Sequence, residues 1–561
     1  MPQEIPKSWN LALGYSKNNH FLSAFQQLSR SSDLEKVQFG LWLLSQQLNQ
    51  QALKWFELLE KKGNREPQLS HYIGICALQL GQLEKPEAYF KRSLLVPQPS
   101  QQSFIIFAQY LREANRFQEA KNALDQMLNI YNQDSDLLIQ SGIFFMEAQQ
   151  YQLSLGYLKK AEERSPQNSM LMNDLANCYQ YLGEFDCSHQ YFKKAVQLNP
   201  NLDGAYVGLA SSKKFHNLQD ISSEQLILKQ LSLTTRAEAK SCAHFALGKI
   251  ADDKQNFEMA WSAYQIANNL QTEIQGKWDA QKWNHNIDLI MQHFASSQNI
   301  EHYSHPSLVK PIFIIGMPRS GTTLLERELC RLESVETAGE LDCIDRILAQ
   351  CSNKESPDIF YSPKLELSVN LAQYRHYYHQ QLLRNCQKAK TTTRWIIDKN
   401  PLNFVHVGLI QRLFPDALFI HSQRNPLDIL VSCYFQHFAH PNMKFSYNLE
   451  NIVEFIYQYQ NLMSFWKSNT QYQIIDVDYE QIVVNTLDKL NEIALILKEP
   501  RLQQLVDAKN GANEEHFVRT ASIWQAKQPI YQKSIHRWRH YQTQLASVPY
   551  QKLQPGLSDG L

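Results

Sequence analysis

A glycine-rich turn between an apolar and an amphipathic segment is the first feature of the sequence that could do chemistry. Residues 311–316 read PIFIIG, and the chain continues directly into MPRSGTTLLEREL. The short β-branched run predicts a buried parallel strand, and the segment after the turn predicts a helix. Gly316 and Gly321 allow a tight turn whose N–H groups point inward, and the helix N-terminus adds partial positive charge. Three side chains of the turn could add donors to a phosphate: Arg319, Thr322 and Thr323.

The spacing of these two glycines matches the first part of the nucleotide-binding loop GxxxxGK[ST]. In this chain Thr322 occupies the position of the Lys. Enzymes that hydrolyse ATP or GTP use that Lys to contact the β- and γ-phosphates. The sequence therefore favours a phosphate ligand other than a nucleoside triphosphate and disfavours a nucleotide kinase.

A second segment could bind an anion together with the first. Residues 418–423 predict another strand, Arg424 follows it, and Pro426 suits the first turn of a helix. Ser432 lies eight residues after Arg424, across this strand-to-helix turn. A guanidinium fork and a hydroxyl placed in this way can converge on one anion.

Together, PRSGTTLL and the pair Arg424 and Ser432 resemble the two nucleotide-binding regions of sulfotransferases that use 3′-phosphoadenosine-5′-phosphosulfate (PAPS). The sequence is most similar to the tyrosylprotein sulfotransferases and to their bacterial relatives fused to tetratricopeptide repeats. The resemblance covers roughly residues 309–545. It implies an α/β P-loop-like domain with a central parallel sheet, with PAPS as co-substrate.

The resemblance also implies roles for individual residues. Arg319, Ser320, Gly321, Thr322 and Thr323 match the loop that holds the 5′-phosphosulfate, and Arg424 and Ser432 match the pair that holds the 3′-phosphate. In WIIDKNPLN, Lys399 matches a Lys near the oxygen that bridges phosphate and sulfate. Tyr479 matches a Tyr in a strand that packs near the nucleotide. The stretch IYQKSIHRWRHY resembles a segment that closes over the nucleotide, with three candidate contacts: Ser534, Arg537 and Trp538.

The general base has two candidates. The family carries its catalytic carboxylate in a Gly-Glu segment, which here reads Ala-Gly-Glu-Leu-Asp from residue 338 to 342. Tyrosylprotein sulfotransferases have Gly-Glu-Glu and use the second Glu, whose position is Leu341 in this chain. We therefore expect Glu340 to be the base and keep Asp342 as the alternative. Arg319 and Lys399 are expected to stabilise the developing charge. No carboxylate cluster suggests a metal, so none is predicted.

A repeat array precedes the segments that carry these candidate site residues. The first half repeats every 34 residues over five units, from about residue 33 to 202, and a later unit near 241–274 returns four residues out of phase. Small residues such as Ala176 let two antiparallel helices approach, and large ones such as Phe192 are expected to fill the space between neighbouring units. The pattern resembles the tetratricopeptide repeat and predicts an all-α solenoid over residues 1–275.

A helical linker is expected over 276–308, the sulfotransferase domain over 309–545 and an irregular tail over 546–561. Such repeats often bind proteins or peptides in their groove. The alternatives are a spacer or a surface for homodimer formation.

Composition excludes several classes of protein. The 561 residues carry 55 basic and 55 acidic side chains, so no charge excess points to nucleic acid or to a membrane surface. The nine Cys are scattered without a CxxC pair, which is typical of a reducing compartment. The first residues show no signal-like pattern. We expect a cytoplasmic location.

These patterns predict a PAPS-dependent sulfotransferase that acts on a hydroxyl, with a protein or peptide tyrosine as the expected acceptor. Two alternatives remain. One keeps the donor and takes a carbohydrate or small-molecule acceptor. The other is a repeat scaffold that binds nucleotide without turnover.

Overall fold

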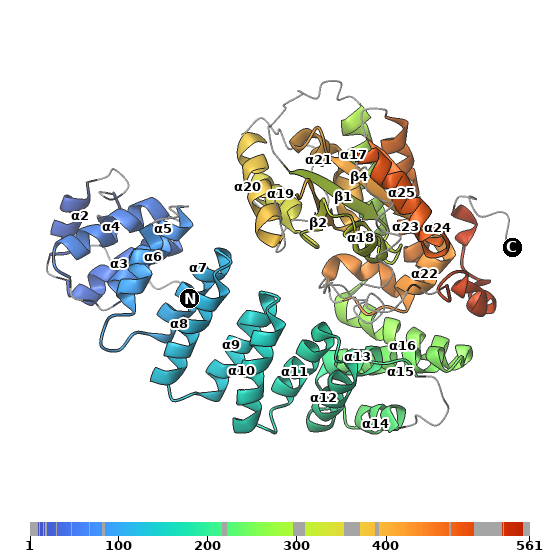
Figure 1. Cartoon of the computed structure of the whole chain (residues 1–561), viewed down its shortest axis with the longest axis horizontal. Coiled ribbons are helices and arrows are strands. Elements are labelled where there is room, and N and C mark those ends of the chain that lie inside the picture. The colour runs from blue at the N-terminus through green and yellow to red at the C-terminus, as the bar shows by residue number, and fades with distance from the viewer. Residues whose placement is uncertain are drawn as a thin grey trace. The chain divides into compact units, whose positions relative to one another are not determined.

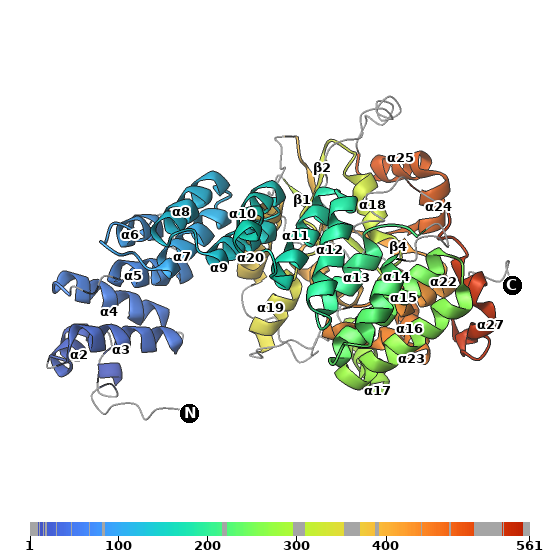
Figure 2. The same cartoon turned by 90° about the horizontal axis from the view of Figure 1, so that it is seen from below.

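The computed structural model describes the larger part of the chain in two compact units, Met1–Ser141 and Gly142–Leu561 (Figures 1 and 2). Each unit is described by itself. The residues described are 9, 12–14, 16, 20–29, 31–46, 48–64, 66, 68–80, 85–215, 222–295, 309–352, 371–386, 392–438, 440–469, 473–498, 530 and 532–553.

The first unit consists of helices joined by short turns. They are α2 (Phe21–Gln27), α3 (Asp33–Ser45), α4 (Asn49–Lys61), α5 (Leu69–Gln79), α6 (Lys85–Ser93), α7 (Gln101–Glu113) and α8 (Phe117–Ile130), with α9 (Ser135–Glu147) containing residues of both units. Each predicted 34-residue window that starts at residue 33, 67 or 101 contains one pair of these helices.

Aromatic side chains pack closely against glycines within the helix pairs. A Cβ on Gly40 would overlap the ring of Phe56 in the same repeat, and a Cβ on Gly74 would lie 2.6 Å from Phe90. Phe56 also stacks on Tyr72 of the next repeat, with ring centroids 5.6 Å apart. The large residue at position twenty-four therefore packs inside its own repeat as well as between neighbours, whereas the sequence predicted only the second contact.

The second unit continues the helix pairs and then changes architecture. Its first helices are α10 (Tyr151–Arg164), α11 (Ser169–Leu182), α12 (Phe185–Leu198), α13 (Asp203–Ser211), α14 (Ser222–Leu231), α15 (Ala237–Asp253), α16 (Phe257–Gln275) and α17 (Ala280–Ala295). The predicted windows 135–168, 169–202 and 241–274 again contain paired helices, with the first residues of α15 lying just ahead of the last window. The helix expected in the linker is α17, and residues 296–308 lie outside the described residues.

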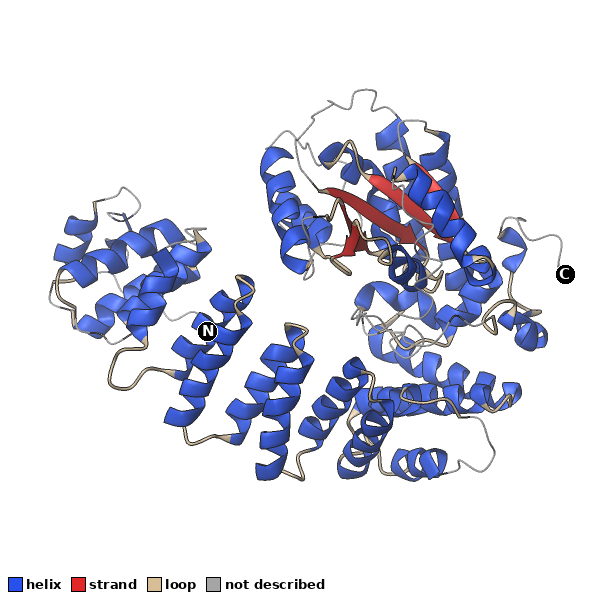
Figure 3. Ribbon diagram, in the orientation of Figure 1, coloured by secondary structure: helices blue, strands red, loops and turns tan. Residues whose placement is uncertain are grey.

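A five-stranded parallel sheet forms the centre of the C-terminal region (Figure 3). Its strands are β1 (Lys310–Gly316), β2 (Val335–Thr337), β3 (Trp395–Lys399), β4 (Leu418–Gln423) and β5 (Ile474–Asp478), in the order β2-β3-β1-β4-β5. From β1 the chain first builds one side of the sheet, with β2 at the edge and then β3 beside β1, and afterwards crosses to the other side for β4 and β5. Ligands of such sheets bind outside the carboxyl ends of the strands where this order reverses.

Helices cover both faces of the sheet. The helices of this region are α18 (Thr322–Leu329), α19 (Cys343–Ser352), α20 (Leu371–Asn385), α21 (Val407–Leu413), α22 (Pro426–Tyr434), α23 (Leu449–Ser468), α24 (Tyr479–Val484), α25 (Thr486–Ile496) and α27 (Gln542–Leu545). Short 3₁₀ helices span Pro401–His406, Pro441–Tyr447, Arg537–Tyr541 and Tyr550–Lys552. On one face Ile314 packs with Leu325 of α18 and Ile493 of α25, and on the other Phe313 belongs to the core that includes α23.

The predicted fold class is confirmed: helix repeats of tetratricopeptide type precede an α/β domain with a central parallel sheet. Strands expected at 311–316 and 418–423 are β1 and β4, and the helix expected from Pro426 is α22. One local prediction was wrong. Tyr479 begins α24 directly after β5 instead of lying in a strand.

The predicted tail is ordered in its first part, because Val548 and Leu553 are buried in the core. Residues 554–561 lie outside the described part of the chain. Among the described helices, none has both the length and the apolar character that a membrane crossing requires.

Candidate functional site

The turn after β1 forms a cradle at the carboxyl end of the sheet. Arg319 and Gly321 both adopt left-handed backbone conformations, with φ of 70° and 96°. A Cβ on Gly321 would overlap the ring of Tyr479, so only glycine fits at this close approach. Gly321 is also the N-cap of α18, and no side chain caps that helix. As in any α-helix, the first N–H groups of α18 have no intrahelical acceptor.

The side chains of this turn lie in the first turn of α18 or just before it. Thr322 is buried and Thr323 is half-buried at the start of the helix. Ser320 is fully buried, and its carbonyl accepts a hydrogen bond of 2.9 Å from the Ser422 hydroxyl at the end of β4. The Ser320 Oγ itself has no hydrogen-bond partner among the described residues. A buried polar atom without a partner is costly unless a ligand satisfies it.

The predicted anion-binding residues converge from different elements. Arg319 Nε donates to Ser432 Oγ at 3.0 Å, which joins the turn to α22. Arg424 Nη1 donates to the Arg319 carbonyl at 2.9 Å, and its Nη2 donates to the Ser534 carbonyl at 2.7 Å. The Arg424 guanidinium stacks 4.6 Å from the ring centroid of Tyr479. Its Nε is buried without a partner among the described residues.

Ser534 contacts this group twice. Besides the carbonyl that accepts from Arg424, its hydroxyl lies 2.6 Å from the Tyr479 hydroxyl. The structure thus brings together residues from the turns after β1 and β4, from α22 and α24 and from the C-terminal segment, although these segments are far apart in the sequence. A glycine turn, two guanidinium groups and several hydroxyls are suited to bind phosphate groups.

Lys399 lies at the end of β3 between two carboxylates. Its buried Nζ forms an ion pair with Glu340 and lies 4.0 Å from Glu326 Oε2 on α18. The Glu340 side chain is 49% exposed, whereas that of Lys399 is 2% exposed. A molecule arriving from solvent can therefore reach the carboxylate without displacing the ammonium.

Hydrogen bonds fix the loop that carries Glu340. The Thr337 hydroxyl donates to Glu326 Oε1 at 2.5 Å and accepts from Gly339 N–H at 2.9 Å. The Gly339 carbonyl in turn accepts from Lys399 N–H at 2.9 Å. Burial raises the pKa of Glu326, although the nearby Lys399 ammonium opposes this effect. Glu326 was not identified from the sequence, where it resembles any polar residue of an amphipathic helix.

The alternative base, Asp342, points elsewhere. Its carboxylate pairs with Arg346 one helical turn later at 2.8 Å, and both side chains are more than 60% exposed. This is an ordinary surface ion pair, and such pairs contribute little energy.

Asp398 lies fully buried beside Lys399 in the sequence but on the opposite face of β3. Its Oδ2 accepts from the Tyr378 hydroxyl at 2.6 Å, and its Oδ1 accepts from the Leu341 N–H at 3.4 Å. Burial raises the pKa of Asp398 to about 7, against the effect of these two hydrogen bonds. Asp398 thus contacts the chain immediately after Glu340, and sequence reasoning missed it.

The three candidate residues of the C-terminal segment have different partners. Ser534 joins the anion-binding group, but Arg537 donates from Nη2 to Asp252 Oδ2 of α15 at 2.6 Å. Its guanidinium lies 5.2 Å from the ring centroid of Phe435. Trp538 is buried, and its backbone N–H donates to Asp428 Oδ1 at 3.0 Å.

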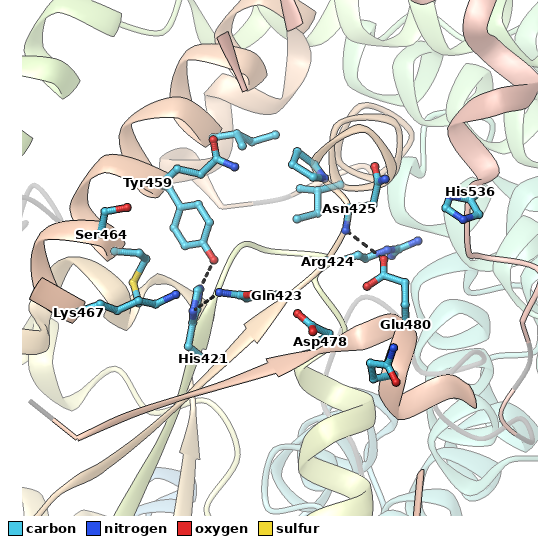
Figure 4. Close-up of a pocket in the computed structure, with 16 residues that line it drawn as sticks. His421, Gln423, Arg424, Asn425, Tyr459, Ser464, Lys467, Asp478, Glu480 and His536 are labelled. Carbon is cyan, nitrogen blue, oxygen red and sulfur yellow. Dashed lines mark hydrogen bonds between the residues drawn. The ribbon is translucent and has the colours of Figure 1, made fainter. Parts of the chain in front are cut away.

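A pocket of about 460 Å³, with Arg424 in its lining, lies between β4, α22, α23 and α24 (Figure 4). In its wall the His421 ring lies between Tyr459 and Gln423 and hydrogen-bonds to both. His421 Nδ1 also lies 2.7 Å from Asp476 on β5. Burial lowers the pKa of His421. A histidine inside the apolar strand LFIHSQ was the available sequence signal for this network.

Among the described residues, no group of three or more His, Cys, Asp or Glu side chains could hold a metal ion.

Comparison with known proteins assigns the C-terminal region. Residues 311–504 match the family model described as the sulfotransferase family. An uncharacterised protein of Aquifex aeolicus (strain VF5) is 28% identical over 408 residues, which cover 70% of this chain and 51% of that protein. The chain thus spans about half the length of the curated relative it matches.

Two solved structures are similar to the repeat array. The C-terminal part of a TPR repeat-containing protein from Cytophaga hutchinsonii is 15% identical, with a TM-score of 0.32, and the match covers 42% of this chain and 95% of that one. YrrB, a TPR protein with an unusual peptide-binding site, is 14% identical, with a TM-score of 0.26, covering 33% of this chain and 95% of that one.

The C-terminal region therefore carries a sulfotransferase family domain. The cradle at the end of β1 and β4 and the Lys399–Glu340 pair lie within the matched residues.

Proposed function

We propose that this protein transfers a sulfuryl group from PAPS to an acceptor hydroxyl, with a tyrosine of a protein or peptide as the acceptor. The observation that carries the proposal is the cradle in which Ser320 Oγ and Arg424 Nε are both buried without a protein partner among the described residues. Ser320 directly precedes Gly321, the N-cap of α18, and Arg424 is joined to the same turn through the Arg319 carbonyl. An anion with several oxygens would satisfy both buried atoms.

The residues present fit such a donor. Arg319, Ser320, Gly321, Thr322 and Thr323 would hold the 5′-phosphosulfate through the turn and the start of α18. Arg424, Ser432, Tyr479 and Ser534 would hold the 3′-phosphoadenosine part. When bound, the donor supplies the sulfuryl group and a phosphate leaving group.

The chain's own residues supply positioning and charge. Glu340 would accept the proton of the acceptor hydroxyl, since its carboxylate reaches solvent while paired with Lys399. A positioned general base typically contributes about 10²–10⁴-fold in rate. Lys399 would provide positive charge where negative charge develops on the leaving side, and Arg319 would do so from the turn. Asp342 is disfavoured because Arg346 engages it at the surface.

The repeat array would present the polypeptide acceptor, and we propose a cytoplasmic enzyme on the resemblance to the bacterial repeat-fused relatives. We retain the predicted organisation, with repeats over 1–275, a helical linker over 276–308, the catalytic domain over 309–545 and a tail over 546–561. No metal is included in the mechanism.

Calorimetric binding of 3′,5′-adenosine bisphosphate, the spent donor, tests the donor site without knowledge of the acceptor. We expect binding by the full chain without magnesium, and a loss of affinity in Arg424→Ala and Ser432→Ala. Asp342→Asn is the matched control, because its carboxylate forms an exposed surface ion pair with Arg346. Binding of ATP with magnesium in place of the bisphosphate would refute the donor assignment.

Turnover with labelled donor then distinguishes the acceptors. Tyrosine-containing peptides should accept the label, and Glu340→Gln should abolish transfer while it leaves bisphosphate binding intact. Transfer to carbohydrates or phenols alone would replace the peptide acceptor with a small one. Binding without transfer to any panel would identify a nucleotide-binding scaffold.

A further inference from the structure

We propose that Asp252, in the last helix pair of the repeat array, is a positioning residue of the donor site. This inference rests on the proposed donor site, since it concerns the segment that carries Ser534. Asp252 lies near the end of α15, within the same compact unit as the sulfotransferase domain. It is separated by 285 residues from Arg537, its partner in the C-terminal segment.

One carboxylate holds both ends of the 3₁₀ helix Arg537–Tyr541. Asp252 Oδ2 accepts from Arg537 Nη2 at 2.6 Å, and Oδ1 accepts from the Tyr541 hydroxyl. The Asp252 side chain is 15% exposed and that of Arg537 is 27% exposed. At this depth an ion pair is only partly screened by solvent, and removal of one partner leaves a costly unpaired charge.

Aromatic side chains of α16 reinforce the same contact. The ring of Phe257 stacks on His540, with centroids 4.4 Å apart, and Trp261 lies 5.7 Å from Tyr541. The repeat array thus forms one wall for the C-terminal segment (Figure 2).

The opposite side of this segment is tied to the donor site. Asp428 of α22 accepts hydrogen bonds from the N–H groups of His536 at 2.8 Å and Trp538 at 3.0 Å. Two residues earlier, Ser534 contacts Arg424 and the Tyr479 hydroxyl. The position of Ser534 therefore depends on a segment whose other end is fixed by the repeats.

Loss of the Asp252 charge would release Arg537 and Tyr541 together. Of the two carboxylates that hold the segment, only Asp428 would remain, and the aromatic contacts would have to hold Arg537 and Tyr541 without an acceptor. Ser534 would then be less firmly fixed against Arg424. Donor affinity should fall, although no residue that contacts the donor has changed. This dependence distinguishes a positioning role from simple support of the repeat fold.

The test uses the full chain and two neighbouring carboxylates. Asp253 is the matched control, because it pairs with Lys249 at 2.5 Å and accepts from Phe215 N–H at 3.1 Å inside the repeats. In Asp252→Asn we expect the Kd for 3′,5′-adenosine bisphosphate to rise about tenfold or more, as for loss of a hydrogen bond to a charged group. Asp253→Asn should lower the melting temperature but keep the wild-type Kd. Asp252→Glu, which retains the charge, should recover part of the affinity.

Hydrogen exchange supplies a readout that needs no ligand. The amides of His536 and Trp538 should exchange faster in Asp252→Asn than in Asp253→Asn. Wild-type affinity and wild-type exchange in Asp252→Asn would overturn the inference. If the wild-type chain fails to bind the bisphosphate, the donor assignment fails and the positioning role with it. In that case the exchange rates still show whether Asp252 holds the segment.

Discussion

Replacement of Asp398 by Asn should remove a penalty on stability that grows with pH. Burial raises the pKa of Asp398 to about 7 in the folded chain, from an ordinary value of 3.8. From about pH 4 to about pH 7 the folded state keeps a proton that the unfolded state has lost, so the free energy of unfolding falls as pH rises. Above the pKa of the folded state both states have lost the proton, so the contribution of Asp398 to the free energy of unfolding no longer changes with pH.

The size of the effect follows from the two pKa values. They differ by about three pH units, and each corresponds to about 1.4 kcal/mol, so the penalty approaches about 4 kcal/mol above pH 7. Asn also weakens the hydrogen bonds from Tyr378 and Leu341, at a cost of about 1–3 kcal/mol at every pH. The variant should therefore be less stable than wild type at low pH and approach or exceed it at high pH.

Amide exchange of β3 peptides measures the stability difference between wild type and variant at the strand itself. A local measurement is needed because the chain has two compact units, which can unfold separately. Wild type and variant are compared at the same pH, at about pH 5, 7 and 9, so that the intrinsic exchange rate cancels. Asp342→Asn is the control, since its exposed pair with Arg346 lies at the surface. If the opening free energies of wild type and variant differ by the same amount at every pH, the raised pKa of Asp398 is refuted.

Two further substitutions test the cradle and the lysine. Gly321→Ala should weaken bisphosphate binding about tenfold or more, because a side chain at φ 96° is strained and would overlap Tyr479. Gly204→Ala is the control, since an added Cβ there meets nothing within 4 Å and should leave binding unchanged. Equal binding in both variants would argue against the tight turn. If the proposed mechanism holds, Glu326→Gln should lower kcat with little change in bisphosphate affinity, because it removes the second carboxylate near the Lys399 ammonium. Glu328→Gln is the control, because Glu328 lies on the same helix but pairs with the half-buried Arg327 and Arg331. It should affect only stability, and similar kcat values for both variants would contradict the role of Glu326.

The sequence predicted the parts of the site that follow from local patterns. Arg319 and Arg424 each follow an apolar strand, and the carboxyl ends of adjacent parallel strands lie at one edge of a sheet. Their convergence could therefore be foreseen. Gly321 was identified by its spacing, although its contact with Tyr479 was not.

The remainder depends on contacts between distant segments. Asp252 is unremarkable on an amphipathic helix, and Arg537 was expected to contact the nucleotide; only folding brings the two together. The partnership of Asp398 with Tyr378 likewise joins β3 to a helix 20 residues earlier in the chain. Tyr479 was assigned to a strand by the family resemblance. Asp478 before it is the N-cap of α24, and an Asp in that place is a common helix start.

The buried Trp283 of α17 has a consequence for how such chains diversify. Its ring stacks on Phe455 of α23, with centroids 4.4 Å apart, and packs edge-on against Phe404. Helices α15 to α17 therefore belong to the same core as the sheet. Whole repeats can be gained or lost ahead of α15, since each contacts mainly its neighbours. Recombination at the junction itself would split that core, so the sulfotransferase family domain should be inherited together with the final helix pair of the repeats.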